Sequence, residues 1–259
     1  MCWPQFSDFG PLGQHGFARN TVRESTRRAR PSQLPSRCRR ARAHTRRASL
    51  QTGAGESSGG DAADVYCELL LRDSDATRAV WPHAFALRLR VTLSAAGALR
   101  MDARVDNTGA EALSFTFALH TYFRVADVTR AAVRGLRGAD YLDSLQARAR
   151  LTEAGDTITF DKEVRSRAPH DASRTHARSH PPAAAAQVDR IYLAVPPAVQ
   201  LADGAASRLF TVATRNLPDA VVWNPWVAKA ASMADFGALS KRNACRTRCA
   251  LTGPRVRRR

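Results

Sequence analysis

The sequence has no apolar run that approaches the ~20 residues a membrane-spanning helix needs. Its first ten residues, MCWPQFSDFG, lack the charged and then apolar order of a secretory signal peptide. Cysteine is scarce: there are five, an odd number, without the spacing of a disulfide framework. These absences argue against a membrane protein and against a disulfide-stabilised secreted domain. We expect an intracellular, cytoplasmic protein and leave a plastid location open.

Acidic residues are missing where basic residues gather. The formal net charge is +17, from 40 Lys and Arg against 23 Asp and Glu. Residues 21–50, 165–188 and 241–259 together hold 22 of the basic residues and two acids, so the rest of the chain is mildly acidic. The basic runs have no interleaved aromatics and no recognisable reading element. Nucleic-acid binding, which would be electrostatic and salt-sensitive, is therefore only a third hypothesis, and we expect no nucleic-acid or membrane partner.

Metal-ligand spacing is also absent from the patterned parts of the chain. His170, His176 and His180 lie in a segment rich in Pro, Ala and Arg, with no predicted strand or helix to hold them together. We therefore expect no metal site.

The patterned regions alternate with a period of two, and no stretch shows a helical period. Phe85–Leu93 (FALRLRVTL) alternates cleanly, and Leu99–Val105 does so after a turn at Ala96-Gly97. Consecutive short alternating runs joined by small turns predict antiparallel sheets in a sandwich or barrel, so the fold class is all-β. Further turns and strands are predicted at Asn107-Thr108-Gly109, from residue 65 to 73, and at Thr157–Phe160, Arg190–Val195, Arg208–Thr214 and Ala220–Trp223.

The stretch from Leu113 to Val125, LSFTFALHTYFRV, points most directly to chemistry. Its apolar residues Leu113, Phe115, Phe117 and Leu119 alternate with small, hydroxylated or titratable ones. A strand with this pattern buries the apolar face and directs His120 away from it. A histidine titrates near ~6.5, so it can move protons in either direction at neutral pH. A hydrogen-bonded structural histidine is the other interpretation.

Four patches outside the basic segments suggest a family: QHGFARN (14–20), ALHTYF (118–123), VDRIYL (188–193) and VVWNPW (221–226). With WPQFSDFGPLG, VDNTG, GLRGADYLDSL and MADFG, they resemble the glucose-6-phosphate 1-epimerases, the hexose-phosphate mutarotase branch of the aldose 1-epimerase family. The resemblance implies a galactose mutarotase-like antiparallel β-sandwich, or supersandwich. Its single domain would comprise residues 1–20, 64–164 and 189–237, with 21–63, 165–188 and 238–259 irregular, basic and exposed.

The resemblance implies an isomerase that opens the pyranose ring of a hexose 6-phosphate and closes it on the other face. By the same resemblance, His120 is the general acid at the ring oxygen, and His15 contacts the sugar. Asp189 accepts hydrogen bonds from sugar hydroxyls, and Arg19 binds the 6-phosphate. We expect these four residues to converge on one concave face. No metal or cofactor is implied, and we expect a monomer.

Several of these residues have other interpretations. Asp189 could form a local ion pair with Arg190, and Arg19 could cap a surface loop. Trp223 and Trp226 could wall the sugar site or belong to the sandwich core, and the two options are evenly balanced. His83 looks structural.

The chain departs from the family pattern at both ends. The family's general base is a glutamate on a strand shortly after the DFG that ends here at Gly237, yet no Asp or Glu follows Asp235. The PQF motif already begins at Pro4, so the preceding strands and a second phosphate-binding arginine are expected to be missing. The abrupt edges of the three basic segments suggest a faulty gene model or decayed copy, or else a protein with disordered insertions.

These departures leave a second functional hypothesis open, a non-catalytic carbohydrate-binding β-sandwich. They also predict that the chain as written binds hexose phosphate weakly and is a poor mutarotase. Restoring a C-terminal strand that ends in glutamate should raise the rate, and His120→Ala should abolish that gain.

Overall fold

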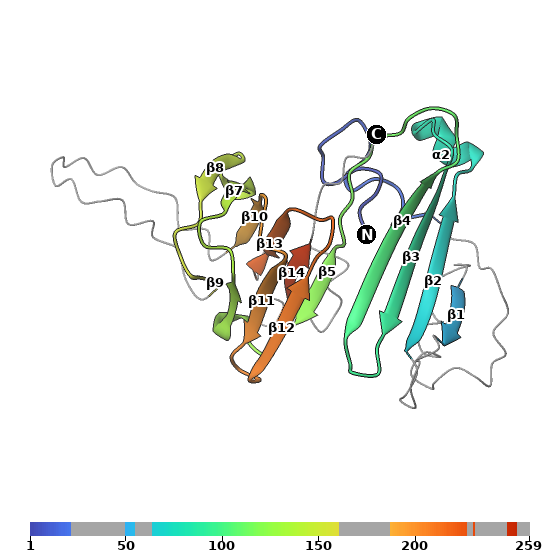
Figure 1. Ribbon diagram of the computed structural model, residues 1–259. Helices are drawn as coiled ribbons and strands as arrows, with labels where there is room; N and C mark the ends of the chain where they lie inside the picture. Colours follow the sequence, from blue (N-terminus) through green and yellow to red (C-terminus); the bar gives the residue numbers. More distant parts are fainter. Residues whose placement is uncertain (22–49, 55–63, 161–186, 227–229, 231–247, 253–259) are drawn as a thin grey trace. The chain divides into compact units, whose positions relative to one another are not determined.

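The computed structural model describes residues 1–21, 50–54, 64–160, 187–226, 230 and 248–252 of the 259-residue chain (Figure 1). Contacts divide the chain into two compact units, which we call the first unit (Cys2–Phe115) and the second unit (from Thr116 onward). Within the described residues, the strands form three antiparallel sheets, one in the first unit and two in the second.

The first unit contains a four-stranded sheet in the order β1-β2-β3-β4. Its strands are β1 (Leu50–Ala54), β2 (Val65–Arg72), β3 (Phe85–Leu93) and β4 (Leu99–Asn107). The bounds of β3 are those predicted from its alternation. Leu89 lies opposite Leu69 on β2 and Ala103 on β4, so apolar residues share one face of the sheet. Ion pairs such as Arg90–Glu68 lie on the other.

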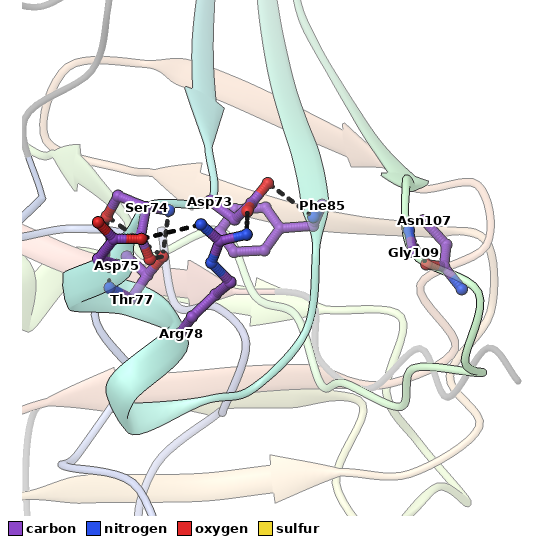
Figure 2. Close-up of polar contacts among 8 residues, drawn as sticks. All are labelled: Asp73, Ser74, Asp75, Thr77, Arg78, Phe85, Asn107 and Gly109. Atoms are coloured by element: carbon purple, nitrogen blue, oxygen red, sulfur yellow. Dashed lines mark hydrogen bonds and ion pairs between the residues drawn. The ribbon is translucent and has the colours of Figure 1, made fainter.

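A short helix, α2 (Asp75–Val80), joins β2 to β3 and was not predicted from periodicity. Figure 2 shows why six residues suffice: the Ser74 side chain accepts from the Thr77 N–H and the Thr77 hydroxyl accepts from the Ser74 N–H, a capping box. Arg78 pairs with Asp75 at 2.9 Å one turn earlier. The same view shows the predicted turn after β4, where the Gly109 N–H donates to the Asn107 side chain at 3.0 Å.

Aromatic side chains form the core of the first unit. Trp3 is fully buried, and its ring lies 4.5 Å from that of Phe85, 5.1 Å from Trp81 and 5.7 Å from Phe17 in edge-on arrangements. Each such pair adds roughly 0.5–1.5 kcal/mol beyond the burial of its area. This cluster joins the N-terminal loop to the sheet.

The second unit contains two sheets. The six-stranded sheet has the order β5-β14-β13-β10-β7-β8, and the four-stranded sheet has the order β12-β11-β6-β9. The elements of the unit are β5 (Thr121–Arg124), η3 (Val128–Arg130), β6 (Ala131–Arg134), β7 (Asp140–Asp143), η4 (Ser144–Gln146), β8 (Ala149–Thr152), β9 (Thr157–Thr159), β10 (Val188–Tyr192), β11 (Ala198–Asp203), β12 (Arg208–Ala213), β13 (Ala220–Asn224) and β14 (Arg248–Thr252).

The two sheets of the second unit share one hydrophobic core, as in a sandwich. Tyr192 of β10 and Val222 of β13 are fully buried from the six-stranded side, and Leu201 of β11 and Val133 of β6 from the other. Burying a side chain of this size stabilises by roughly 1.5–3 kcal/mol. The antiparallel all-β class is confirmed.

Three expectations about strands were wrong in part. The strand expected over Leu113–Val125 is regular only at β5, although Leu113, Phe115 and Phe117 are buried as predicted. Residues 50–54 and 248–252, expected to be irregular, form β1 and β14. A strand is held by main-chain hydrogen bonds, and those depend little on side-chain composition, which was the basis of the expectation.

Candidate active site

A row of residues crosses four adjacent strands of the six-stranded sheet. Tyr122 on β5 lies opposite Ala250 on β14, and Ala250 lies opposite Trp223 on β13. Trp223 in turn lies opposite Asp189 on β10. Residues directly opposite each other in antiparallel strands share a face of the sheet. We call the face that contains Tyr122, Trp223 and Asp189 the Trp223 face; Figure 1 shows β5, β14, β13 and β10 side by side.

His120 joins this row from the residue before β5. Its ring centroid lies 5.0 Å from that of Tyr122 and 6.1 Å from that of Trp223, and the Tyr122 and Trp223 rings are 6.0 Å apart. The side chain is half-buried and its Nδ1 atom is buried. Because His120 and Tyr122 are two residues apart in extended chain, they fall on the same side. The structure therefore brings two predicted site residues, His120 and Asp189, to the two flanks of Trp223.

The opposite face of this sheet, which we call the Tyr192 face, contains a network of ion pairs and hydrogen bonds. Arg190 donates to Glu153 at 3.0 Å and lies 3.8 Å from Asp143, with its guanidinium 4.7 Å from the Tyr141 ring centroid. The Tyr192 hydroxyl donates to the same Glu153 oxygen at 2.7 Å. Burial raises the pKa of Tyr192 well above its ordinary value, so the hydroxyl remains a donor.

This network bears on the ion-pair interpretation of Asp189. Arg190, its neighbour in β10, pairs with Glu153 and Asp143 across the Tyr192 face, while Asp189 lies in register with Trp223 on the other face. Adjacent residues of a strand point to opposite faces, which separates the two side chains.

The two tryptophans of the VVWNPW motif have different packing partners. From the sequence, each could either wall the sugar site or belong to the sandwich core. Trp226 packs against the core of the sandwich together with residues such as Phe123 and Phe210. Trp223 packs instead against Tyr122 and the fully buried Ala230, on the side of His120. Trp226 therefore belongs to the sandwich core, whereas Trp223 packs on the face that contains Tyr122 and Asp189.

A buried carboxylate holds the end of β5. Asp203, at the end of β11, is fully buried and accepts hydrogen bonds from the Ala126 N–H at 3.1 Å and from Arg208 at 2.7 Å. Arg208 also donates to the Arg124 carbonyl at 3.3 Å. Burial raises the pKa of Asp203, but the hydrogen bonds from Arg208 and Ala126 outweigh it and leave the pKa below its ordinary value. The ionised carboxylate thus fixes the segment that follows Tyr122.

In the first unit, a glutamine organises the loop that contains His15 and Arg19. The buried Gln5 side chain accepts from the Leu12 N–H at 2.9 Å and donates to the Leu12 and Ser7 carbonyls at 2.9 and 3.2 Å. Gly16 lies beside the Trp3 carbonyl, where a Cβ would come within 2.4 Å of the oxygen. Only glycine fits this close approach, which explains the glycine after His15.

His15 itself has a defined tautomer. The Nδ1 atom of its ring accepts a hydrogen bond from the Ser7 N–H at 3.1 Å. The backbone N–H of His15 donates to the Ser7 carbonyl at 2.8 Å. An accepting Nδ1 carries no proton, so the neutral ring has its proton on Nε2. The residue has a left-handed backbone, with φ of 67°. The loop therefore presents a ring N–H donor, the type of group that a sugar oxygen accepts from.

Arg19 is exposed and lies close to His15 along the loop. Its guanidinium donates to the Gln14 carbonyl at 3.4 Å, the loop-capping contact that was its other interpretation. One long hydrogen bond leaves most of a guanidinium's five donors for other acceptors. His83, expected to be structural, packs on Trp81 with ring centroids 4.5 Å apart.

The four predicted site residues thus fall into two pairs. His15 and Arg19 lie in the first unit, and His120 and Asp189 lie in the second. The convergence of the two pairs on one substrate stays a prediction, as does the single domain that would unite them. Within the described ranges no three His, Cys, Asp or Glu residues are grouped to hold a metal ion. His170, His176 and His180 lie outside the described residues.

The family can be read from comparison with known proteins. The family model for aldose 1-epimerase matches residues 54–248, which is most of the chain. The chain belongs to the aldose 1-epimerase family.

No helix among the described residues has the length and apolar character needed to cross a membrane.

Two curated relatives carry the same name. A Cenchrus ciliaris protein named "Putative glucose-6-phosphate 1-epimerase" is 36% identical over 245 residues, which are 94% of this chain and 60% of that protein. A protein of the same name from Escherichia coli strain K12 is 27% identical over 91% of this chain and 60% of its own length. The chain therefore spans about 60% of the length of these relatives.

Solved structures show the fold. A Salmonella typhimurium protein described as a "putative mutarotase (YeaD)" superposes with a TM-score of 0.63 at 23% identity, over 98% of this chain and 64% of that one. A galactose mutarotase-like protein from Lactobacillus casei gives a TM-score of 0.54 at 14% identity, over 94% and 64%. The galactose mutarotase-like fold expected from the resemblance is confirmed.

Two features of the candidate site escaped sequence analysis. Tyr122 was not singled out, although its position two residues after His120 in an extended segment places both on one side. The place of β14 between β5 and β13 had no signal at all, because its residues belong to the arginine-rich tail.

Proposed function

We propose that this chain interconverts the α and β anomers of a hexose 6-phosphate through acid–base opening and closure of the pyranose ring. The observation that supports this most directly is the grouping of His120, Trp223 and Asp189 on one face of the six-stranded sheet. Membership of the aldose 1-epimerase family supports the reaction type. The 6-phosphate is supported by the names of the curated relatives.

Each residue has a role that its chemistry suits. Ring opening needs a proton at the ring oxygen and the loss of one from the anomeric hydroxyl. Protonated His120 donates the first, since imidazole titrates close to neutral pH. Asp189 accepts hydrogen bonds from sugar hydroxyls, and the Trp223 ring packs against the C–H groups of the pyranose. The proposal thus gives each of these three residues of the second unit a separate role.

The loop of the first unit contains two further groups that suit a hexose 6-phosphate. The guanidinium of Arg19 suits the oxygens of the 6-phosphate, and the Nε2–H of His15 donates to a sugar oxygen. Arg19→Ala should raise the KM for glucose 6-phosphate about tenfold, or ~1.4 kcal/mol of binding, and leave the KM for glucose unchanged. Arg104→Ala, an exposed arginine on β4, is the matched control. An equal change for both sugars would remove Arg19 from phosphate binding.

No residue of this chain is assigned as the base, so the proposal has water accept the proton that leaves the anomeric hydroxyl. Position 250 is in register with both Tyr122 and Trp223, so it occupies the centre of the row. We therefore expect Ala250→Glu to increase the anomer exchange rate, whereas the isosteric but uncharged Ala250→Gln should not.

The test is the rate of exchange between the α and β anomers of glucose 6-phosphate, measured by exchange NMR or polarimetry. The unmodified chain should accelerate exchange weakly, and Ala250→Glu should add at least about tenfold, since a positioned acid or base typically contributes 100- to 10,000-fold. His120→Ala should abolish the acceleration in both backgrounds. Equal rates with and without His120 would refute the proposal.

A non-catalytic carbohydrate-binding protein is the second candidate. The observation in its favour is that no Asp or Glu follows Asp235 in this sequence. It predicts that glucose 6-phosphate binds to the chain without any His120-dependent exchange. The same NMR samples distinguish the two candidates, because binding shifts resonances whether or not exchange occurs.

A further inference from the structure

We propose that Tyr122 is a positioning residue for His120: its ring fixes the plane of the imidazole from which the proton is delivered. The inference rests on the proposed function and assigns a role to a residue in its site. The first support is geometric. The Tyr122 and His120 rings lie 5.0 Å apart at 35°, and the Trp223 ring meets His120 at 6.1 Å and 80°.

Two neighbours with different inclinations define the orientation of a ring better than one. The final torsion of a histidine side chain is broad and intrinsically two-fold, so the backbone alone does not set the imidazole plane. The Tyr122 ring is tilted by 35° from that plane, and the Trp223 ring is nearly perpendicular to it at 80°. Together they restrict rotation of the imidazole about its final bond. Proton transfer needs this restriction, because reacting atoms must be aligned at near-contact distance.

Tyr122 is itself held in place from several directions. The fully buried Ala230 packs against both Tyr122 and Trp223, and the Trp223 ring meets that of Tyr122 at 65°. The next residue, Phe123, packs into the sandwich core with its ring 5.5 Å from that of Phe210. Beyond it, Asp203 accepts the Ala126 N–H. A ring supported in this way can transmit the rigidity of the sandwich to His120.

The contribution of Tyr122 to the core is small by comparison. Its side chain is half-buried and lies outside the main hydrophobic cluster of the second unit, which contains Tyr141 and Tyr192 instead. Its removal should therefore affect the orientation of His120 more than the stability of the unit. This separates a positioning role from a purely structural one.

The experiment compares Tyr122→Phe, which keeps the ring, with Tyr122→Ala, which removes it. Tyr66→Ala is the matched control, a half-buried tyrosine on β2 that contacts Arg90. We expect Tyr122→Ala to lower kcat for anomer exchange by about 10- to 100-fold, the cost of a small misplacement of a catalytic group, with KM changed less than about threefold. Tyr122→Phe should restore kcat to within about threefold of the unmodified chain.

A second readout needs no catalysis. The imidazole proton resonances of His120, assigned by their loss in His120→Ala, should move in Tyr122→Ala and stay near their original positions in Tyr122→Phe and Tyr66→Ala. If exchange does not depend on His120 at all, the proposed function fails, and these resonances alone decide whether Tyr122 orients the ring. The positioning role is overturned by unchanged His120 resonances, by a Phe variant as impaired as the Ala variant, or by a loss confined to KM.

Discussion

The two faces of the six-stranded sheet are built from neighbouring residues that have opposite surroundings. Asp189 lies in register with Trp223, while Arg190, the next residue, is paired with Glu153 on the other face. Tyr122 packs beside His120, and Phe123 packs into the sandwich core. One strand therefore contributes to stability with the residues on one side and to the candidate site with those on the other. Substitutions at adjacent positions should therefore separate folding from activity.

The largest effect is expected on the Tyr192 face. Tyr192→Ala removes a fully buried aromatic side chain and should lower the free energy of unfolding by about 3–5 kcal/mol. Tyr192→Phe removes only the hydroxyl that donates to Glu153 and should cost about 1–2 kcal/mol. Urea unfolding at constant m-value measures both. A Tyr192→Ala protein of unchanged stability would contradict the claim that the Tyr192 face stabilises the fold.

The two tryptophans test the same division at positions three residues apart. Trp226→Ala should lower the free energy of unfolding by about 2–3 kcal/mol, because Trp226 packs on the sandwich core. Trp223→Ala should cost less stability and raise the KM for glucose 6-phosphate about tenfold. Thermal unfolding and anomer-exchange kinetics on the same samples give the result. If Trp223→Ala lowered stability more and Trp226→Ala raised the KM more, the assignment of the two tryptophans would be wrong.

Asp203 on β11 holds the segment that follows β5, and its contribution to stability should depend on pH. Its pKa is lowered in the folded state, so its stabilisation is complete above the unfolded value of about 3.9 and is lost as the pH falls through the folded value. Asp203→Asn should cost about 1–3 kcal/mol at neutral pH, because the buried hydrogen bonds lose their charge. The difference between the two proteins should shrink below about pH 4. A difference that grows on acidification would contradict the assignment.

The smallest effect is expected for Asp189→Asn. The amide keeps the shape but accepts hydrogen bonds less strongly, so the KM for the sugar should rise about tenfold, or ~1.4 kcal/mol. Because Asp189 is half-buried and Asn has nearly the same volume, the free energy of unfolding should change by less than about 1 kcal/mol. A large loss of stability with unchanged KM would support a structural role for Asp189.

Alternation predicted the strands that bury one face. β3 has the predicted bounds, and β10 and β13 lie where strands were expected: β13 starts at the predicted residue, and the other ends are shifted by one to three residues. Periodicity did not predict that Leu113–His120 would be irregular. Alternate residues are buried there, as in a strand, but the backbone does not form a regular strand. β14 was missed since main-chain pairing, and not its side-chain pattern, defines it.

The candidate site was predictable as a set of residues but not as an arrangement. Family resemblance singled out His120 and Asp189, whereas the register that sets Asp189 opposite Trp223 depends on long-range strand order. The roles of Trp223 and Trp226 were balanced in the sequence because both are large and apolar. Only their packing partners, Ala230 for one and the sandwich core for the other, distinguish them.

The most direct test of the account is a titration of the ¹⁵N-labelled chain with glucose 6-phosphate, followed through the indole N–H resonances. Substitution of each tryptophan by Phe assigns the four signals, from Trp3, Trp81, Trp223 and Trp226. We expect the Trp223 signal to move, together with the His120 ring resonances, and the Trp226 signal to stay in place. A shift of Trp226 with Trp223 unchanged would contradict it.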